Sequence, residues 1–134
     1  MIGVVDTSAL IRLFVPDGPL PDSFEEFMRG VERGVNRAIA PELLVAEAAN
    51  VLHKKQGLQE LTSDESVQLL LDVLSVPIRL FPHRPVIFRA FEIAHKHRST
   101  VYDALYLALA EEHGAAIFSA DKELVKIAAK LQLL

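Results

Sequence analysis

The chain contains no cysteine, which excludes disulfide bonds, zinc–thiolate sites and a thiol nucleophile. It also lacks any uninterrupted apolar run that approaches the roughly 18 residues of a membrane-spanning helix. Its first segment, MIGVVDTSALIRLF, has no basic start, and Asp6 interrupts its apolar run, so we do not expect a signal peptide. These absences predict a cytoplasmic protein with no membrane attachment.

The chain has no excess of positive charge either. Its 14 lysines and arginines stand against 18 acidic residues, for a net charge of −4. This balance argues against a protein that coats nucleic acid by bulk electrostatics. It does not exclude a nucleic-acid enzyme, because a site built from carboxylates would itself make the chain acidic. The length predicts one domain, residues 1–134, which needs no disulfide or structural metal to fold.

Short apolar strands alternate with amphipathic helices along the chain. Strands are predicted at 2–5, 36–40, 76–81 and 115–119, and helices at 9–15, 21–33, 41–55, 62–74, from Pro85, at 101–112 and at 121–131. The last residues, LQLL, form either a fifth short strand or a tail. This alternation predicts an α/β fold with a central parallel sheet of four to five short strands, flanked by helices on both sides.

The stretch PELLVAEAANVL, residues 41–52, contains an unexpected acid. A helix that is apolar on every face is normally buried, yet Glu47 lies in the middle of this one. A buried carboxylate requires a partner, a metal ion or the loss of its charge. Glu47 is therefore a candidate functional residue.

Three further acids are predicted to lie near Glu47. Asp6 follows the first strand and Asp121 the last, and Asp103 opens the helix that returns to that last strand. Because the carboxyl ends of parallel strands meet at one edge of a sheet, all four acids are expected at that edge. Like charges there raise one another's pKa unless a cation is bound. Oxygen ligands without histidine or cysteine suit Mg²⁺ or Mn²⁺.

With these acids aligned, the chain resembles the PIN-domain nucleases, in particular the VapC-type toxins of toxin–antitoxin pairs. The matching segments are VVDTSALIRLF (4–14), APELLVAEAANVL (40–52) and TVYDALYLALAEEHGAAIFSADKEL (100–124). The third segment is the most specific, since it combines an acid opening an alanine-rich helix, a strand, and Ser-Ala-Asp directly after that strand. The resemblance extends over nearly the whole chain.

The resemblance implies a Mg²⁺- or Mn²⁺-dependent endoribonuclease that leaves a 5′-phosphate and a 3′-hydroxyl. It implies a homodimer, and a small VapB-like antitoxin whose tail fills the acidic groove. By this resemblance, Asp6, Glu47, Asp103 and Asp121 match the family's acidic quartet. Ser119 and Ser8 match the two hydroxyl residues that accompany it.

Each acid except Glu47 also has an ordinary structural explanation. Asp6 and Asp121 could cap helices, and Asp103 would be favoured by the dipole of its helix. Glu42 competes with Glu47 as the ligand, but its place at a helix start already accounts for it. Helix capping does not explain the four acids as a group, because it gives no reason for Glu47.

Weaker candidates surround the four acids. Asn50 lies on the same helical face as Glu47, where it either supports that acid by a hydrogen bond or is a satisfied buried amide. Arg12, and Arg98 in the cationic run 95–98, could contact substrate phosphates or the antitoxin. A solvated helix end explains the run 95–98 equally well.

Tyr102 and Tyr106 are predicted to serve packing or dimer contacts rather than base stacking.

Two rival functions fit the sequence poorly. A haloacid-dehalogenase phosphatase needs a second aspartate at the position of Ser8, and a receiver domain needs a phosphoacceptor aspartate after its central strand, where this chain has none. Two alternatives within the resemblance stay open. One is a housekeeping PIN ribonuclease, and the other is a PIN-like protein-binding module without catalysis.

Overall fold

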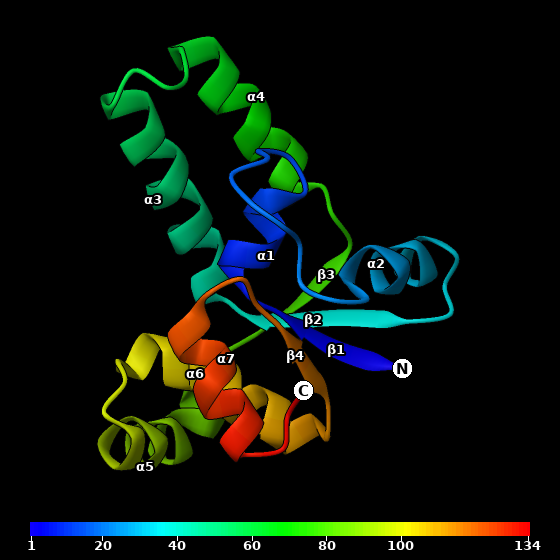
Figure 1. Ribbon diagram of the computed structural model, residues 1–134, viewed down its shortest axis with the longest axis vertical. Helices are drawn as coiled ribbons and strands as arrows, with labels where there is room; N and C mark the ends of the chain where they lie inside the picture. Colours follow the sequence, from blue (N-terminus) through cyan, green and yellow to red (C-terminus); the bar gives the residue numbers. More distant parts are fainter.

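The computed structural model describes residues 1–134, and a parallel sheet runs through its centre (Figure 1). Its strands are β1 (Ile2–Val5), β2 (Arg37–Pro41), β3 (Ile78–Phe81) and β4 (Ala116–Phe118), in the order β3-β2-β1-β4. In the register, Val4 of β1 lies opposite Ile39 on one side and Ile117 on the other. The predicted parallel sheet is confirmed, and all four carboxyl ends face the same edge.

Helices flank this sheet. They are α1 (Thr7–Arg12), α2 (Phe24–Glu32), α3 (Leu43–Gly57), α4 (Ser63–Leu74), α5 (Ile87–His97), α6 (Val101–His113) and α7 (Lys122–Lys130), with a 3₁₀ turn η1 at Arg84–Val86. In Figure 1, α3 and α4 form a hairpin that projects from one end of the molecule, and α5, α6 and α7 gather at the other. None of these helices combines the length and apolarity that crossing a membrane requires.

Several predicted boundaries shift at prolines. Pro41 ends β2, opposite Phe81 of β3, and α3 begins only at Leu43. Proline donates no hydrogen bond, so it is tolerated at the end of a strand, and the Glu42 N–H makes the next bond to the Phe81 carbonyl, at 2.9 Å. Similarly, α2 begins at Phe24 rather than at Pro21, because Ser23 takes a left-handed conformation (φ 65°).

One predicted strand boundary is corrected, and the two alternatives for the end of the chain are resolved. The third strand begins at Ile78, two residues later than predicted, because the Ile78 N–H first closes a turn onto the Val76 carbonyl (2.8 Å). The end of the chain forms no fifth strand. The Leu133 carbonyl accepts a hydrogen bond from the Ile117 N–H of β4 (2.7 Å), but the Leu133 N–H donates to the Ala128 carbonyl of α7 (2.9 Å) and not to a strand. The final residues are therefore a docked tail.

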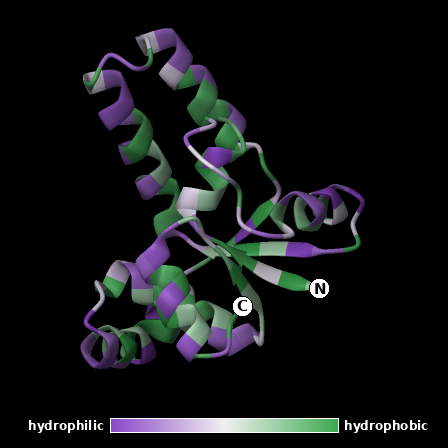
Figure 2. Cartoon of the chain, in the orientation of Figure 1, coloured by the Kyte–Doolittle hydropathy of each residue, from purple (hydrophilic) through white to green (hydrophobic).

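Helix α6 carries much of the core. All seven residues from Ala104 to Ala110 are buried. Figure 2 colours the chain by hydropathy and shows the strands of the sheet mostly in the green of hydrophobic residues. Its first turn is fixed by Thr100, whose hydroxyl accepts from the Asp103 N–H (3.1 Å). Gly114 ends it in a left-handed conformation (φ 56°). The buried helix α6 thus fixes the position of Asp103 at the edge of the sheet.

Substituting Gly3 by alanine should destabilise the protein. A Cβ at this position in β1 would lie 2.6 Å from Phe27 Cζ and 2.7 Å from Phe118 Cε2, and those two rings are stacked with centroids 4.6 Å apart. We expect Gly3→Ala to lower the free energy of unfolding in urea by roughly 1–3 kcal/mol, as overpacked cores do. Gly57→Ala is the matched control, since a Cβ there meets nothing within 4 Å. Equal stability of the two variants would contradict the prediction.

Candidate active site

Asp6 stands at the carboxyl end of β1 and is buried, with 6% of its surface exposed. One carboxylate oxygen, Oδ2, accepts hydrogen bonds from the hydroxyls of Ser8 (2.6 Å) and Ser119 (2.7 Å). Burial raises the pKa of Asp6, while the two hydroxyl bonds act in the opposite direction. Although Asp6 occupies the position before α1, its side chain makes no capping bond. The capping explanation therefore fails for this residue.

The two serines join the ends of β1 and β4. The Ser8 hydroxyl oxygen accepts from the Ala120 N–H (2.9 Å), and that of Ser119 accepts from the Asp121 N–H (3.0 Å). Each serine therefore uses its oxygen to fix the backbone after β4 and its proton to hold Asp6. Both were predicted as site residues, and the structure places both against this carboxylate.

Glu47 receives two hydroxyl groups from other helices. Its Oε1 accepts from Tyr106 of α6 (2.6 Å) and from Thr7 of α1 (3.0 Å), and those two hydroxyl oxygens lie 2.8 Å apart. Tyr106 is fully buried, and burial, followed by the bond to Glu47, raises the pKa of its hydroxyl. The acid in the apolar helix thus has partners that hold one oxygen in place.

Asp103 and Asp121 complete the group differently. Asp103 lies in the first turn of α6, and its carboxylate accepts no hydrogen bond from the protein. Burial, then the charges of Asp121, Asp6 and Glu47 in that order, raise its pKa to about 6. Asp121 is exposed, and its Oδ1 caps α7 by accepting from the N–H groups of Glu123 (2.9 Å) and Leu124 (3.2 Å). For Asp121 the capping explanation is confirmed.

The four acids therefore share one region electrostatically, yet no three of them are arranged to hold a metal ion. The physical reason lies in their hydrogen bonds. Asp6 turns toward two serines, Glu47 toward a tyrosine and a threonine, and Asp121 toward its own helix. The donor chemistry nevertheless suits a hard divalent cation, because every available ligand is a carboxylate oxygen. One oxygen each of Asp6, Glu47 and Asp121 remains outside these hydrogen bonds.

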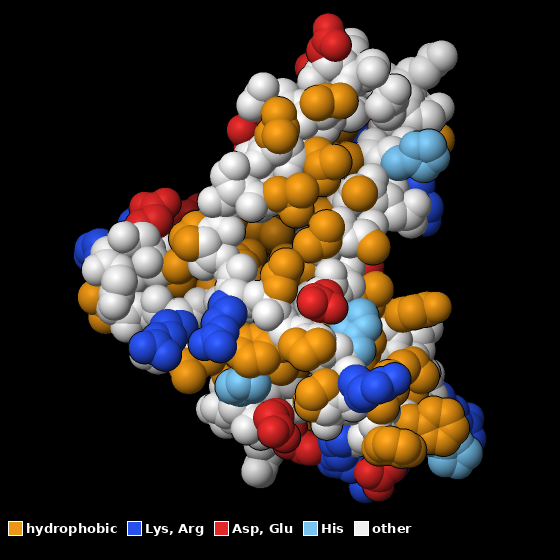
Figure 3. Space-filling view, turned by 180° about the vertical axis from the view of Figure 1, so that it is seen from behind, with side chains coloured by type: hydrophobic (Ala, Val, Ile, Leu, Met, Phe, Trp, Pro, Cys, Tyr) orange, Lys and Arg blue, Asp and Glu red, His pale blue; other side chains and the backbone are white.

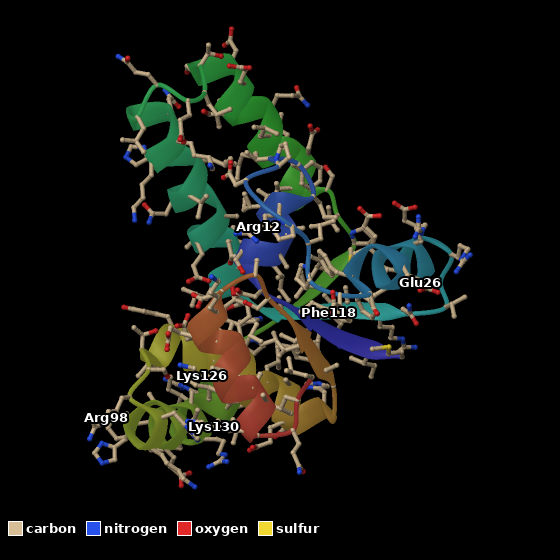
Figure 4. All side chains as sticks on the ribbon, viewed as in Figure 1. Arg12, Glu26, Arg98, Phe118, Lys126 and Lys130 are labelled. Atoms are coloured by element: carbon tan, nitrogen blue, oxygen red, sulfur yellow. The ribbon has the colours of Figure 1, made fainter.

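The weaker candidates lie apart from this group. Asn50 is exposed and makes no hydrogen bond to Glu47, whose partners are instead Thr7 and Tyr106. Arg12 donates to the Pro19 carbonyl (2.8 Å) and so braces the loop after α1. Arg98 is exposed at the end of α5, and Figure 4 shows it well away from Arg12. Glu42 is exposed before α3 and contacts none of the acids through a hydrogen bond.

Sequence reasoning missed Thr7 and Tyr106. Two signals were available: Thr7 directly follows Asp6, and Tyr106 comes three residues after Asp103, which places it on the same face of α6. A polar group in a helix buried on all sides needs a partner. Glu47 could not be inferred as the partner of these two residues, because it lies on α3, far from both in the sequence.

The class defined so far is an α/β protein with a carboxylate site at the carboxyl edge of a parallel sheet. Comparison with known families matches residues 3–130 to the PIN domain. The chain belongs to the PIN-domain family.

Curated relatives and solved structures agree with this assignment. Ribonuclease VapC3 of Pyrobaculum aerophilum is 35% identical over 130 residues, which cover 92% of each chain. Ribonuclease VapC12 of Mycobacterium tuberculosis is 27% identical over 92% of this chain and 89% of its own. A crystal structure from P. aerophilum has a TM-score of 0.71 at 25% identity, covering 95% of this chain and 87% of its own. The M. tuberculosis toxin VapC20, which cleaves the sarcin-ricin loop, shares the fold (TM-score 0.65, 16% identity, 92% and 93% covered).

Removing the Tyr106 hydroxyl should destabilise the protein. Tyr106→Phe keeps the buried ring but deletes a hydrogen bond to a carboxylate, so we expect the free energy of unfolding to fall by about 1–2 kcal/mol. Tyr102→Phe is the control, because this tyrosine is 61% exposed and its hydroxyl has no partner. Urea unfolding measures both variants. A Tyr106→Phe variant as stable as the control would contradict the role assigned to the hydroxyl.

The raised pKa of Asp103 predicts a pH-dependent stability in metal-free buffer. Its ordinary value is 3.8 and its value in the folded protein about 6, so between these values the unfolded state binds fewer protons. The free energy of unfolding therefore falls as the pH rises through this window. Asp103→Asn should remove the effect. With allowance for solvent screening, the variant should be more stable than wild type by about 1–2 kcal/mol near pH 7.

Near pH 4 the Asp103→Asn variant and wild type should be equally stable, since the carboxyl is then neutral in the folded protein. Urea unfolding in EDTA at several pH values measures the difference. A stability gap that does not change with pH would show that neither burial nor the neighbouring acids raise the pKa of Asp103.

Proposed function

We propose that this chain is a cytoplasmic, Mg²⁺- or Mn²⁺-dependent endoribonuclease, the toxin of a VapBC-like pair. The observation that carries the proposal is the convergence of four acids from separate segments at the carboxyl edge of the sheet, where burial, and then the charges of Asp121, Asp6 and Glu47, raise the pKa of Asp103. Binding a cation relieves the repulsion among such acids. The names of the relatives, Ribonuclease VapC3 and VapC12, support RNA as the substrate.

In this proposal Asp6, Glu47, Asp103 and Asp121 hold the ion. A bound divalent cation supplies an activated water and stabilises charge on the phosphodiester. Ser8 and Ser119 orient Asp6 through one of its oxygens and leave the other for the cation. Cleavage is proposed to leave a 5′-phosphate and a 3′-hydroxyl.

Thr7 and Tyr106 perform for Glu47 the role that the serines perform for Asp6. Both hydroxyls bind Oε1 of Glu47, so Oε2 is left for the cation. Because Tyr106 is fully buried in α6, its position is fixed by the core rather than by the site. One oxygen each of Asp6 and Glu47 is thus held in place, while the carboxylate of Asp103, which accepts no hydrogen bond, is the group that can adjust.

Two protein partners are also proposed. The unpaired acids suit a cationic antitoxin tail, which would neutralise them as a cation does. For a second copy of the chain, the structure offers an apolar surface around a hollow between α3, α4 and β3, where Val45, Leu74 and Leu80 are exposed. Figure 3 shows hydrophobic side chains gathered in a band on the side of the molecule opposite to that of Figure 1. We propose this surface as the homodimer contact.

One observation favours a second candidate, a PIN-like binding module without catalysis. No three acids have the arrangement of a metal site, so the side chains must adjust before they share an ion. Metal binding in solution separates this module from the nuclease, and a housekeeping ribonuclease would differ from a toxin only in its partner and target.

Thermal unfolding in EDTA and in excess Mn²⁺ tests the proposal. Ligand that binds only the folded state stabilises it, by about 2.7 kcal/mol at a hundredfold excess over Kd. We expect this stabilisation in wild type and its loss in Asp103→Asn, together with Mn²⁺-dependent cleavage of RNA by wild type but not by Asp103→Asn. Asp64→Asn, a change to an acid in the first turn of α4, is the matched control and should respond like wild type. A wild type indifferent to Mn²⁺ would favour the binding module.

A further inference from the structure

Two helices begin at the carboxylates, and their first residues flank the site. Tyr102 precedes Asp103 on α6, and Lys122 follows Asp121 on α7. α7 begins directly after β4, at the carboxyl edge of the sheet, and the start of α6 with Asp103 lies at the same edge. Side chains beside these acids would meet the parts of a substrate that extend beyond the cleaved bond.

A row of lysines leads away from the site along α7. Lys122, Lys126 and Lys130 are spaced four residues apart, which places them on one helical face, about 6 Å apart along the axis. All three are exposed, and none forms an ion pair. Figure 4 shows Lys126 and Lys130 along α7, in the same part of the view as Arg98. In a chain of net charge −4, this cationic face stands out from the acidic average.

Tyr102 adds an aromatic surface at the start of α6. It is 61% exposed, whereas Tyr106, one turn later, is fully buried. Of the two roles predicted for Tyr102, packing within the chain is therefore excluded, and a dimer contact stays a prediction. Tyr102 and Lys122 each stand beside one of the acids. An exposed ring and a cationic face at one site are the combination by which proteins hold single strands, since bases stack on the ring and phosphates follow the cations.

We propose that single-stranded RNA crosses the N-termini of α6 and α7, with one base stacked on Tyr102 and successive phosphates along Lys122, Lys126 and Lys130. This inference rests on the proposed ribonuclease function. Single-stranded substrate is favoured because the bases of a duplex are already stacked on one another and do not expose a face to the ring. The lysine row repels a cationic antitoxin tail, so RNA is its better occupant.

Binding is measured on the Asp103→Asn background in EDTA, which prevents cleavage. The probe is a short fluorescein-labelled oligouridylate, followed by anisotropy at several KCl concentrations. The test variants are Lys126→Glu with Lys130→Glu, and Tyr102→Ala beside Tyr102→Phe. The matched control reverses two exposed cations at other places, Arg33→Glu with Lys54→Glu. Thermal unfolding of every variant checks that the fold is kept.

Loss of two phosphate contacts should reduce the slope of log K against log salt by about 1.4, at about 0.7 per contact on a single strand. Tyr102→Ala should weaken binding by roughly tenfold, whereas Tyr102→Phe, which keeps the stacking ring, should bind like the parent. The Arg33 and Lys54 control should keep the salt slope of the parent. The same oligonucleotide in a duplex should bind Tyr102→Ala and the parent equally.

Unchanged affinity and salt slope in the lysine and tyrosine variants would overturn the inference. If the corresponding variants with Asp103 intact still cleave RNA with Mn²⁺, the ribonuclease function stands and only the RNA path is wrong. An effect of Tyr102→Ala on self-association alone would equally overturn the path, in favour of a dimer contact. A parent that binds no RNA and a wild type that cleaves none would overturn both proposals.

Discussion

The gathering of four carboxylates at one edge of the sheet, where burial and then neighbouring charges raise the pKa of Asp103, is the constraint on which the site depends. The parallel sheet directs the ends of its strands to one edge, and acids follow those ends closely. Left to themselves, such side chains would turn away from one another into solvent. The fold prevents this for Asp6 and Glu47, because each gives one oxygen to two hydroxyl groups. Pairs of hydroxyls thus offset repulsion with short, fixed hydrogen bonds.

These hydroxyls come from elements that the core already fixes. Three consecutive residues, Asp6-Thr7-Ser8, all contribute to the site. Asp6 is one of its acids, the Thr7 hydroxyl binds Glu47, and the Ser8 hydroxyl binds both Asp6 and the backbone after β4. Tyr106 reaches Glu47 from a helix buried on every side. The geometry of the acids therefore depends on the packing of α1, α3 and α6 against the sheet.

Much of the fold and the acids of the site could be predicted from the sequence. Alternating apolar strands and amphipathic helices define the parallel sheet, and the position of Asp6, Asp103 and Asp121 beside strand ends follows from topology alone. Helix starts at prolines were less predictable, because Pro41 suits the end of a strand as well as the first turn of a helix. Periodicity cannot decide between those uses.

The partners of the acids could not be predicted, because they depend on three-dimensional packing. Asn50 shares a helical face with Glu47, yet it points to solvent, while Thr7 and Tyr106 approach from two other helices. For an acid after a strand, capping a helix does not exclude a place beside the other acids. Asp121 caps α7 through Oδ1 and still acts on the charge of Asp103.

The hairpin of α3 and α4 has a further consequence for anyone who wishes to modify this protein. Its tip, residues 58–61, is largely exposed and includes Gln59 in a left-handed conformation (φ 61°), and the next helix is restarted by its own capping box at Thr62 and Glu65. α4 therefore begins without help from the tip, whereas backbone N–H groups of the tip close the end of α3 on the carbonyls of Lys54, Lys55 and Gln56. A fluorophore, an affinity tag or a short inserted sequence placed at this tip would lie at the far end of the hairpin, away from the carboxylates (Figure 1).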